Sequence, residues 1–83
     1  MAAIEYSTRA ADWLRDAEPE VQERVMAKLE QAGEWPDHFL DALSGVPYYK
    51  LRIGDYRAII DWRREDDVLF VRRIGHRRNV YDR

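Results

Sequence analysis

Residues 50–60 read KLRIGDYRAII, and this segment gives the clearest prediction of secondary structure in the chain. Apolar and polar side chains alternate on both sides of Gly54-Asp55, as they do in strands that bury one face. Gly54-Asp55 is a signal for a tight turn, although the more common order is Asp-Gly. The stretch therefore predicts a β-hairpin, with one strand over residues 48–53 and the next over residues 56–63.

Alternation also assigns the side chains to the two faces of this hairpin. The apolar positions fall together on one face: Tyr49, Leu51, Ile53, Tyr56, Ala58, Ile60 and Trp62. If this face packs on the rest of the protein, Lys50 and Arg57 must share the opposite face, with Arg52 on the same side of its strand as Lys50. The pattern thus predicts a group of cations on an open face of the sheet, where a ligand can reach them.

The segment before the hairpin predicts a helical hairpin. Residues 8–32 carry apolar side chains at helical spacing, with Ser7 or Thr8 as the N-cap and Gly33 as the C-terminal stop. Residues 3–6 are compatible with a short strand in front of the helices. The apolar stripe of the helices must be buried, and the apolar face of the sheet is the surface that can bury it.

A loop and a last strand complete the predicted fold. Residues 33–47 predict a connecting loop, and residues 68–74 predict a central strand that Gly75 ends. Because Arg72 and Arg73 are neighbours in that strand, we expect them to face opposite ways. The expected fold class is α+β in a single domain, residues 1–83. Its elements follow in the order β-α-α-β-β-β, and a helical hairpin packs on one face of a small, mostly antiparallel sheet.

The composition excludes several classes of function. The chain of 83 residues has no cysteine, and its two histidines, His38 and His76, are far apart, so we expect neither a disulfide framework nor a metal site. No apolar run reaches the roughly 18 residues of a membrane span, so we expect no membrane partner. The first residues lack the basic and apolar regions of a signal peptide, which predicts a cytoplasmic location.

Charge is distributed unevenly along the chain. Residues 1–47 have four basic and ten acidic side chains, a formal charge of −6, whereas residues 48–83 have ten basic and six acidic ones, a formal charge of +4. Nine of the ten basic residues in the second part are arginines, whose planar guanidinium groups match the geometry of phosphate oxygens. A nucleic-acid partner is therefore one interpretation, and a solvated sheet with salt-bridged edges is the other.

Two segments resemble one known family. KLRIGDYRAII (50–60) is similar to the central hairpin of the RelE/ParE toxin superfamily, and VRRIGHRRNVY (71–81) is similar to the closing strand and tail of its RelE branch. The resemblance implies a toxin of a type II toxin–antitoxin system with a RelE-like fold. It also implies a ribosome-dependent endoribonuclease, or mRNA interferase, that cuts mRNA by attack of a ribose 2′-OH on the adjacent phosphate. This chemistry requires no cofactor.

The resemblance also implies roles for individual residues. Arg57, Lys50, Arg77 and Tyr81 match the family's catalytic positions. The second strand lysine of the family falls on Tyr48 here, which is a departure that Arg52, on the same strand face, is expected to offset in part. Tyr48, Arg52, Arg78 and His76 are the candidate substrate-binding residues.

The general base is an open choice between two residues. Tyr81 matches the family's tail tyrosine, and nearby arginines at positions 77, 78 and 83 favour the phenolate over the phenol, whose pKa is ordinarily about 10. His76 is the alternative, since an unperturbed histidine has a pKa of about 6.5. We rank His76 below Tyr81.

Other interpretations remain open at this stage. Arg57 could form an ion pair with Asp61 or with a helix carboxylate. The chain could be a ParE-like inhibitor of DNA gyrase that cuts no RNA, or an inactive homologue that only binds its antitoxin. The mRNA interferase, the gyrase inhibitor and the inactive homologue all imply a cognate antitoxin. We expect the antitoxin to wrap the domain with an acidic, disordered segment that orders on binding. The resulting complex could bind operator DNA through the antitoxin.

Overall fold

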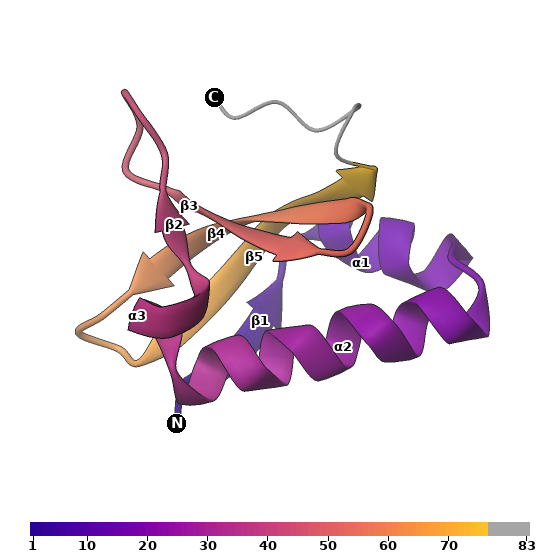
Figure 1. Ribbon diagram of the computed structural model, residues 1–83, viewed down its shortest axis with the longest axis horizontal. Helices are drawn as coiled ribbons and strands as arrows, with labels where there is room; N and C mark the ends of the chain where they lie inside the picture. Colours follow the sequence, from indigo (N-terminus) through magenta and orange to yellow (C-terminus); the bar gives the residue numbers. More distant parts are fainter. Residues whose placement is uncertain (77–83) are drawn as a thin grey trace.

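The hairpin predicted from residues 50–60 lies inside the sheet (Figure 1). In the computed structural model, which describes residues 1–76, β3 (Tyr49–Ile53) and β4 (Tyr56–Arg63) pair antiparallel with Leu51 opposite Ala58. Gly54 has a φ of 57°, a left-handed conformation that glycine adopts at little cost. The two strands and their turn are confirmed.

Within the described residues, the strands form one sheet in the order β1-β5-β4-β3-β2. The outer strands are β1 (Ala3–Tyr6) and the short β2 (Asp41–Ala42), and β5 (Val68–His76) lies between β1 and β4. β1 is parallel to β5, and the other neighbouring strands are antiparallel. The sheet is therefore mostly antiparallel, as predicted.

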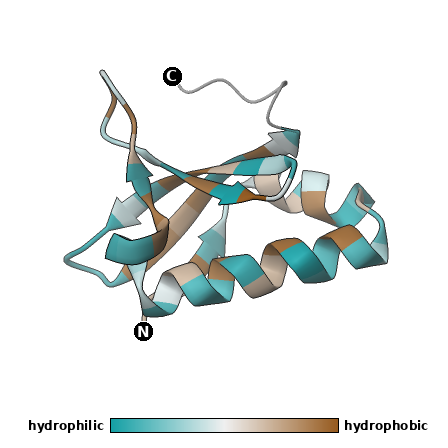
Figure 2. Ribbon diagram, viewed as in Figure 1, coloured by the Kyte–Doolittle hydropathy of each residue, from teal (hydrophilic) through white to brown (hydrophobic). Residues whose placement is uncertain are grey.

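Two helices cover one side of this sheet (Figure 1). They are α1 (Thr8–Asp16) and α2 (Pro19–Glu34), which confirm the helical hairpin. In Figure 2 the hydrophobic colour lies in separate bands along α2, as expected for an amphipathic helix. The largest fully buried side chains come from α2 and the sheet: Val25, Leu29, Leu51, Ile53, Ile60, Leu69 and Val71. No helix within residues 1–76 is long and apolar enough to cross a membrane.

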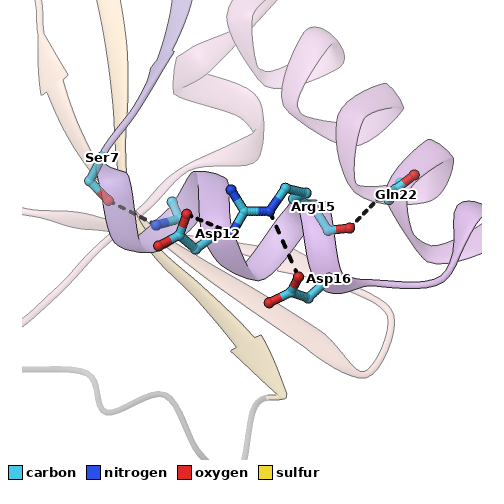
Figure 3. Close-up of polar contacts among 6 residues, drawn as sticks. Ser7, Asp12, Arg15, Asp16 and Gln22 are labelled. Atoms are coloured by element: carbon cyan, nitrogen blue, oxygen red, sulfur yellow. Dashed lines mark hydrogen bonds and ion pairs between the residues drawn. The ribbon is translucent and has the colours of Figure 1, made fainter.

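Hydrogen bonds fix both ends of α1 (Figure 3). Ser7 is the N-cap, and its Oγ accepts a hydrogen bond from the backbone N–H of Ala10 at 3.0 Å. Beyond the other end, Nε2 of Gln22 in α2 donates to the carbonyl oxygens of Leu14, at 2.8 Å, and Arg15, at 3.3 Å. The side chain of Gln22 thus satisfies carbonyl groups that the end of a helix leaves without partners.

The prediction that Gly33 stops the second helix is wrong. α2 continues through Gly33 to Glu34. A Cβ at position 33 would lie 3.1 Å from the carbonyl oxygen of Ala2 and 3.3 Å from Cδ1 of Ile4. The glycine therefore allows β1 to approach α2 closely, and the backbone N–H of Ala2 donates to the Gly33 carbonyl at 2.9 Å.

The segment predicted as a loop, residues 33–47, contains two short elements. α3 (Pro36–Phe39) begins with a proline at its first position, where the missing N–H costs nothing. β2 follows, and Asp41 pairs with Lys50 of β3. β2 is a strand because it pairs with β3, and its two residues alone are too short to show a strand pattern. The full order is therefore β-α-α-α-β-β-β-β rather than β-α-α-β-β-β.

β5 differs from its prediction in length and regularity. It does not end at Gly75 but continues to His76, which pairs with Tyr56. Its register also shifts, because Ile59 pairs with Arg73 whereas the next residue, Ile60, pairs with Val71. Arg72 is therefore the extra residue of a β-bulge. The bulge breaks strict alternation, so the prediction that Arg72 and Arg73 face opposite ways does not hold.

Candidate functional site

Within residues 1–76, one side of the sheet carries no helix, and we call this side the open face. The side chains of β3, β4 and β5 that the register places there are Lys50, Arg52, Arg57, Ile59, Asp61, Arg63, Val68, Phe70 and Arg73. The alternate residues Leu51 and Ala58 are only 1% and 0% exposed, because they belong to the core under the helices. The predicted grouping of Lys50, Arg52 and Arg57 on one face is thus confirmed by the register.

Two of these cations lie directly opposite each other. Arg52 on β3 and Arg57 on β4 are cross-strand partners, and Cβ atoms of such partners are about 4.5–5.5 Å apart. On its other side Arg57 faces Gly75 of β5, which has no side chain. Like charges at opposed positions destabilise a sheet, whereas an anion between them can accept hydrogen bonds from both guanidinium groups. The arrangement therefore fits a phosphate or carboxylate ligand.

The alternative that Arg57 forms an ion pair with Asp61 does not match the geometry. Asp61 accepts from Nε of Arg63, with Oδ2 and Nε 3.2 Å apart. The guanidinium of Arg63 also lies over the ring of Phe70, 4.6 Å from its centroid. Four residues of strand, about 13 Å, separate Asp61 from Arg57. Asp61 is thus the partner of Arg63 at the end of the open face that is distant from the Gly54 turn.

Lys50 continues the row of cations along β3. It lies opposite Ile59, two residues from Arg52 on the same face. Tyr48 lies two residues further on, just before β3, and its ring contacts the guanidinium of Arg72 at 4.2 Å from the centroid. Both candidate residues Lys50 and Tyr48 are half-buried. Tyr48 and Arg72 therefore extend the same surface.

His76 does not lie with these residues. It is the cross-strand partner of Tyr56, and the two ring centroids are 6.0 Å apart. Tyr56 in turn makes an edge contact with Trp13 of α1, at 5.6 Å, which identifies this as the helix side of the sheet. The ring of His76 is thus on the other side of the sheet from Arg57, and its role in substrate binding stays a prediction.

Three candidate residues, Arg77, Arg78 and Tyr81, lie outside the described residues. Their roles therefore stay predictions. Residues 1–76 hold no cluster of three or more histidine or acidic side chains that could bind a metal ion. One tyrosine has a shifted pKa: burial, and to a smaller extent the carboxylate of Glu30, raise the pKa of Tyr6 on β1.

Arg72 is the residue of this surface that alternation failed to place. Two consecutive arginines between the apolar residues Val71 and Ile74 break the period of two. That break is the signal in the sequence that could have indicated a β-bulge at this position.

Comparison with known proteins gives the family. The model of the "ParE toxin of type II toxin-antitoxin system, parDE" matches residues 2–81, so the chain belongs to this toxin family within the RelE/ParE superfamily. It is accordingly a toxin of the type II class. A search of curated proteins finds no match.

Solved RelE structures share the fold. The toxin of the intact Escherichia coli RelBE toxin–antitoxin complex has a TM-score of 0.78 and 28% identity, over 92% of this chain and 96% of that one. The isolated E. coli RelE toxin has a TM-score of 0.79 and 26% identity, over 92% of this chain and 84% of that one. The toxin–antitoxin complex RelBE2 of Mycobacterium tuberculosis has a TM-score of 0.82 at 18% identity, over 90% of this chain and 96% of that one. At this identity the likeness shows a shared fold and nothing further.

Proposed function

We propose that the protein is a ribosome-dependent endoribonuclease that cuts mRNA by attack of a ribose 2′-OH on the adjacent phosphate. The observation that carries this proposal is the open face, where Lys50, Arg52 and Arg57 project from neighbouring strands. Guanidinium groups bind phosphate oxygens through paired, charge-assisted hydrogen bonds. The scissile phosphate would therefore bind between Arg52 and Arg57.

The charges that develop during this reaction match such a site. Attack of the 2′-oxygen increases the negative charge on the non-bridging oxygens of the phosphorus. In the proposed mechanism Arg57 and Lys50 stabilise this charge, because preorganised cations act most strongly where charge grows in the transition state. Arg52 holds the same phosphate from β3, and Tyr48 belongs to the RNA-binding surface beside it.

Residues of the tail complete the proposed mechanism. Arg77 follows Gly75 by two positions in the sequence, and Gly75 is the residue of β5 that faces Arg57. We assign to Arg77 the stabilisation or protonation of the leaving 5′-oxygen, to Tyr81 the removal of the 2′-OH proton, and to Arg78 a contact with the substrate. His76 is the alternative base.

The proposed partner of the toxin is a cognate antitoxin. E. coli RelE, which is similar to this chain, was solved in complex with its antitoxin. A cationic open face is suited to an acidic segment that orders on binding. We propose that the toxin acts in the cytoplasm and that any contact of the complex with operator DNA is made by the antitoxin.

A second candidate function is inhibition of DNA gyrase without RNA cleavage. It is favoured by one observation, namely that the matching family model is that of ParE toxins. This candidate does not require the cations of the open face as a phosphate site. A supercoiling assay with purified gyrase distinguishes it from the first proposal.

The test of the first proposal uses purified protein, ribosomes and a defined mRNA, with cut sites mapped by primer extension. We expect the wild-type protein to cut the mRNA and Arg57→Gln to cut it roughly 10²–10³ times more slowly. Arg63→Gln is the matched control, because Arg63 is on the same strand and face but is paired with Asp61. Uncut mRNA with the wild-type protein, or equal losses in both variants, would contradict the proposal.

A further inference from the structure

One contact on the open face, between Arg72 and Tyr48, has no part in the proposed mechanism. The guanidinium carbon of Arg72 lies 4.2 Å from the centroid of the Tyr48 ring. Tyr48 precedes β3 and Arg72 belongs to β5, and β4 lies between these two strands. The side chain of Arg72 therefore crosses β4 on the open face to reach Tyr48.

The β-bulge makes this reach possible. Val71 and Ile74, which flank the two arginines, are 0% and 4% exposed, so both point into the core. In a regular strand, residues three apart point to opposite faces, and the extra residue of the bulge removes this conflict. As a result neither Arg72 nor Arg73 enters the core, and Arg72 is exposed.

Ser7 fixes the backbone of the bulge. The hydroxyl of Ser7 donates to the carbonyl oxygen of Arg72 at 2.7 Å, and the backbone N–H of Ser7 donates to the carbonyl oxygen of Val71 at 2.9 Å. A bulge leaves backbone groups outside the regular ladder of hydrogen bonds, and here the residue that caps α1 supplies partners. The position of Arg72 is thus set by the fold as well as by Tyr48.

Arg72 is held by a ring rather than by a carboxylate. Ion pairs within residues 1–76 join Arg15, Arg24, Arg63 and the N-terminus to acidic side chains, and none of these pairs includes Arg72. Contact with an aromatic ring restrains a guanidinium while its N–H groups stay available to other acceptors. Such restraint lowers the entropy that binding an anion would cost.

The spacing of the cations follows β3. Positions 52, 50 and 48 fall on the same face, and neighbouring members of this series are about 6.7 Å apart along a strand. The first two positions carry Arg52 and Lys50, but position 48 carries an uncharged tyrosine. Arg72, lying over that tyrosine, places a positive charge where the sequence of β3 has none. The three cations then form a row along one strand.

We propose that Arg72 is a further phosphate-binding residue of the RNA site, and that Tyr48 is the residue that positions it. The phosphate concerned is a different one from the scissile phosphate, because about 13 Å of strand separates position 48 from the Arg52–Arg57 pair. The inference rests on the proposed function for its substrate, RNA. It explains why a tyrosine occupies position 48, where the resemblance to the toxin family predicts a lysine.

The experiment measures binding of a short, fluorescently labelled single-stranded RNA with 2′-O-methyl groups, which cannot be cut by 2′-OH attack. Anisotropy titrations at several salt concentrations give the slope of log K against log [salt]. Removing one phosphate contact is expected to reduce that slope by about 0.7. We expect this reduction for Arg72→Gln but not for Arg72→Lys, which keeps the charge.

Variants of Tyr48 test the positioning role. Tyr48→Phe keeps the ring that positions Arg72 and should keep the salt slope of the wild type, whereas Tyr48→Leu should reduce the slope as Arg72→Gln does. In the Arg72→Gln background Tyr48→Leu should have little further effect, since the two residues act together. Arg64→Gln is the matched control, because Arg64 also contacts a ring, that of Trp62 at 3.8 Å, on the helix side.

The results of these experiments distinguish failure of the inference from failure of the proposed function. An unchanged salt slope in Arg72→Gln, an equal change in Arg64→Gln, or no binding of the RNA by the wild type overturns the inference. Wild-type protein that binds RNA through Arg72 but leaves mRNA on ribosomes uncut supports the inference and refutes the proposed function. Thermal unfolding of every variant, with melting temperatures close to wild type expected, confirms that the comparison is between folded proteins.

Discussion

At the scale of single residues, the opposed pair Arg52 and Arg57 links the fold to the proposed function most directly. Two guanidinium groups at directly opposed cross-strand positions repel each other, and this repulsion is an unfavourable contribution to the stability of a sheet. An anion bound between the two guanidinium groups attracts both of them and so offsets their repulsion. A sheet with such a pair is therefore better suited to binding than to stability alone.

A prediction follows for Arg52→Gln. At low ionic strength this change should raise the free energy of unfolding by a few tenths of a kcal/mol, up to about 1 kcal/mol. The gain should nearly vanish in 1 M salt, where the screening length falls to about 3 Å. Urea unfolding at both salt concentrations measures it, with Arg9→Gln on α1 as a control for the same change of net charge. A loss of stability at low salt, or a gain independent of salt, would be inconsistent with repulsion between the two arginines.

Alternation in the sequence placed some of these residues correctly and failed for others. Lys50 and Arg57 share a face as predicted because β3 and β4 pair in regular register. Arg72 and His76 could not be placed, because the bulge in β5 shifts every side chain beyond it by one position. A single extra residue therefore decided that His76 lies with Tyr56 rather than with Arg57.

At the scale of elements, Ser7 connects α1 with β5. Its hydroxyl accepts from the backbone N–H of Ala10 and donates to the carbonyl of Arg72, so one side chain caps a helix and holds a bulge. These two elements are adjacent in the fold but lie far apart in the sequence. Loss of the hydroxyl should therefore affect both.

We predict that Ser7→Ala lowers the free energy of unfolding by about 1–2 kcal/mol, the usual cost of losing a helix cap together with a backbone contact. Ser7→Thr keeps the hydroxyl and should cost less than half as much. Thermal or urea unfolding of the two variants provides the measurement. Equal stability of wild type and Ser7→Ala would show that the two hydrogen bonds do not contribute.

The predictability of each element depended on where its stabilising contacts lie. The helices and the β3–β4 hairpin were predicted because their periodicity and turn residues are local. β2 was missed because it exists through pairing of Asp41 with Lys50. Gly33 was read as a stop signal, but it is needed inside α2 so that the backbone of Ala2 can approach.

At the scale of the whole molecule, the charge asymmetry of the sequence becomes a separation between two sides of the sheet. The strongly acidic first part of the chain includes α1 and α2, and the basic second part provides β3, β4 and β5. A net charge of −2 therefore conceals a cationic surface on the side without helices. Such a surface attracts polyanions, and under the proposed function the RNA strand and the acidic antitoxin segment would compete for it.

The most direct test of the central claim, that this open face cuts RNA by 2′-OH attack, is the chemistry of the cut ends. Wild-type protein is incubated with ribosomes carrying a defined mRNA, and the fragments are analysed for their terminal groups. We expect a 2′,3′-cyclic phosphate on the upstream fragment and a 5′-hydroxyl on the downstream one, and we expect both to form far more slowly when Arg57→Gln replaces the wild type. Fragments that begin with a 5′-phosphate, or mRNA that stays intact, would contradict it.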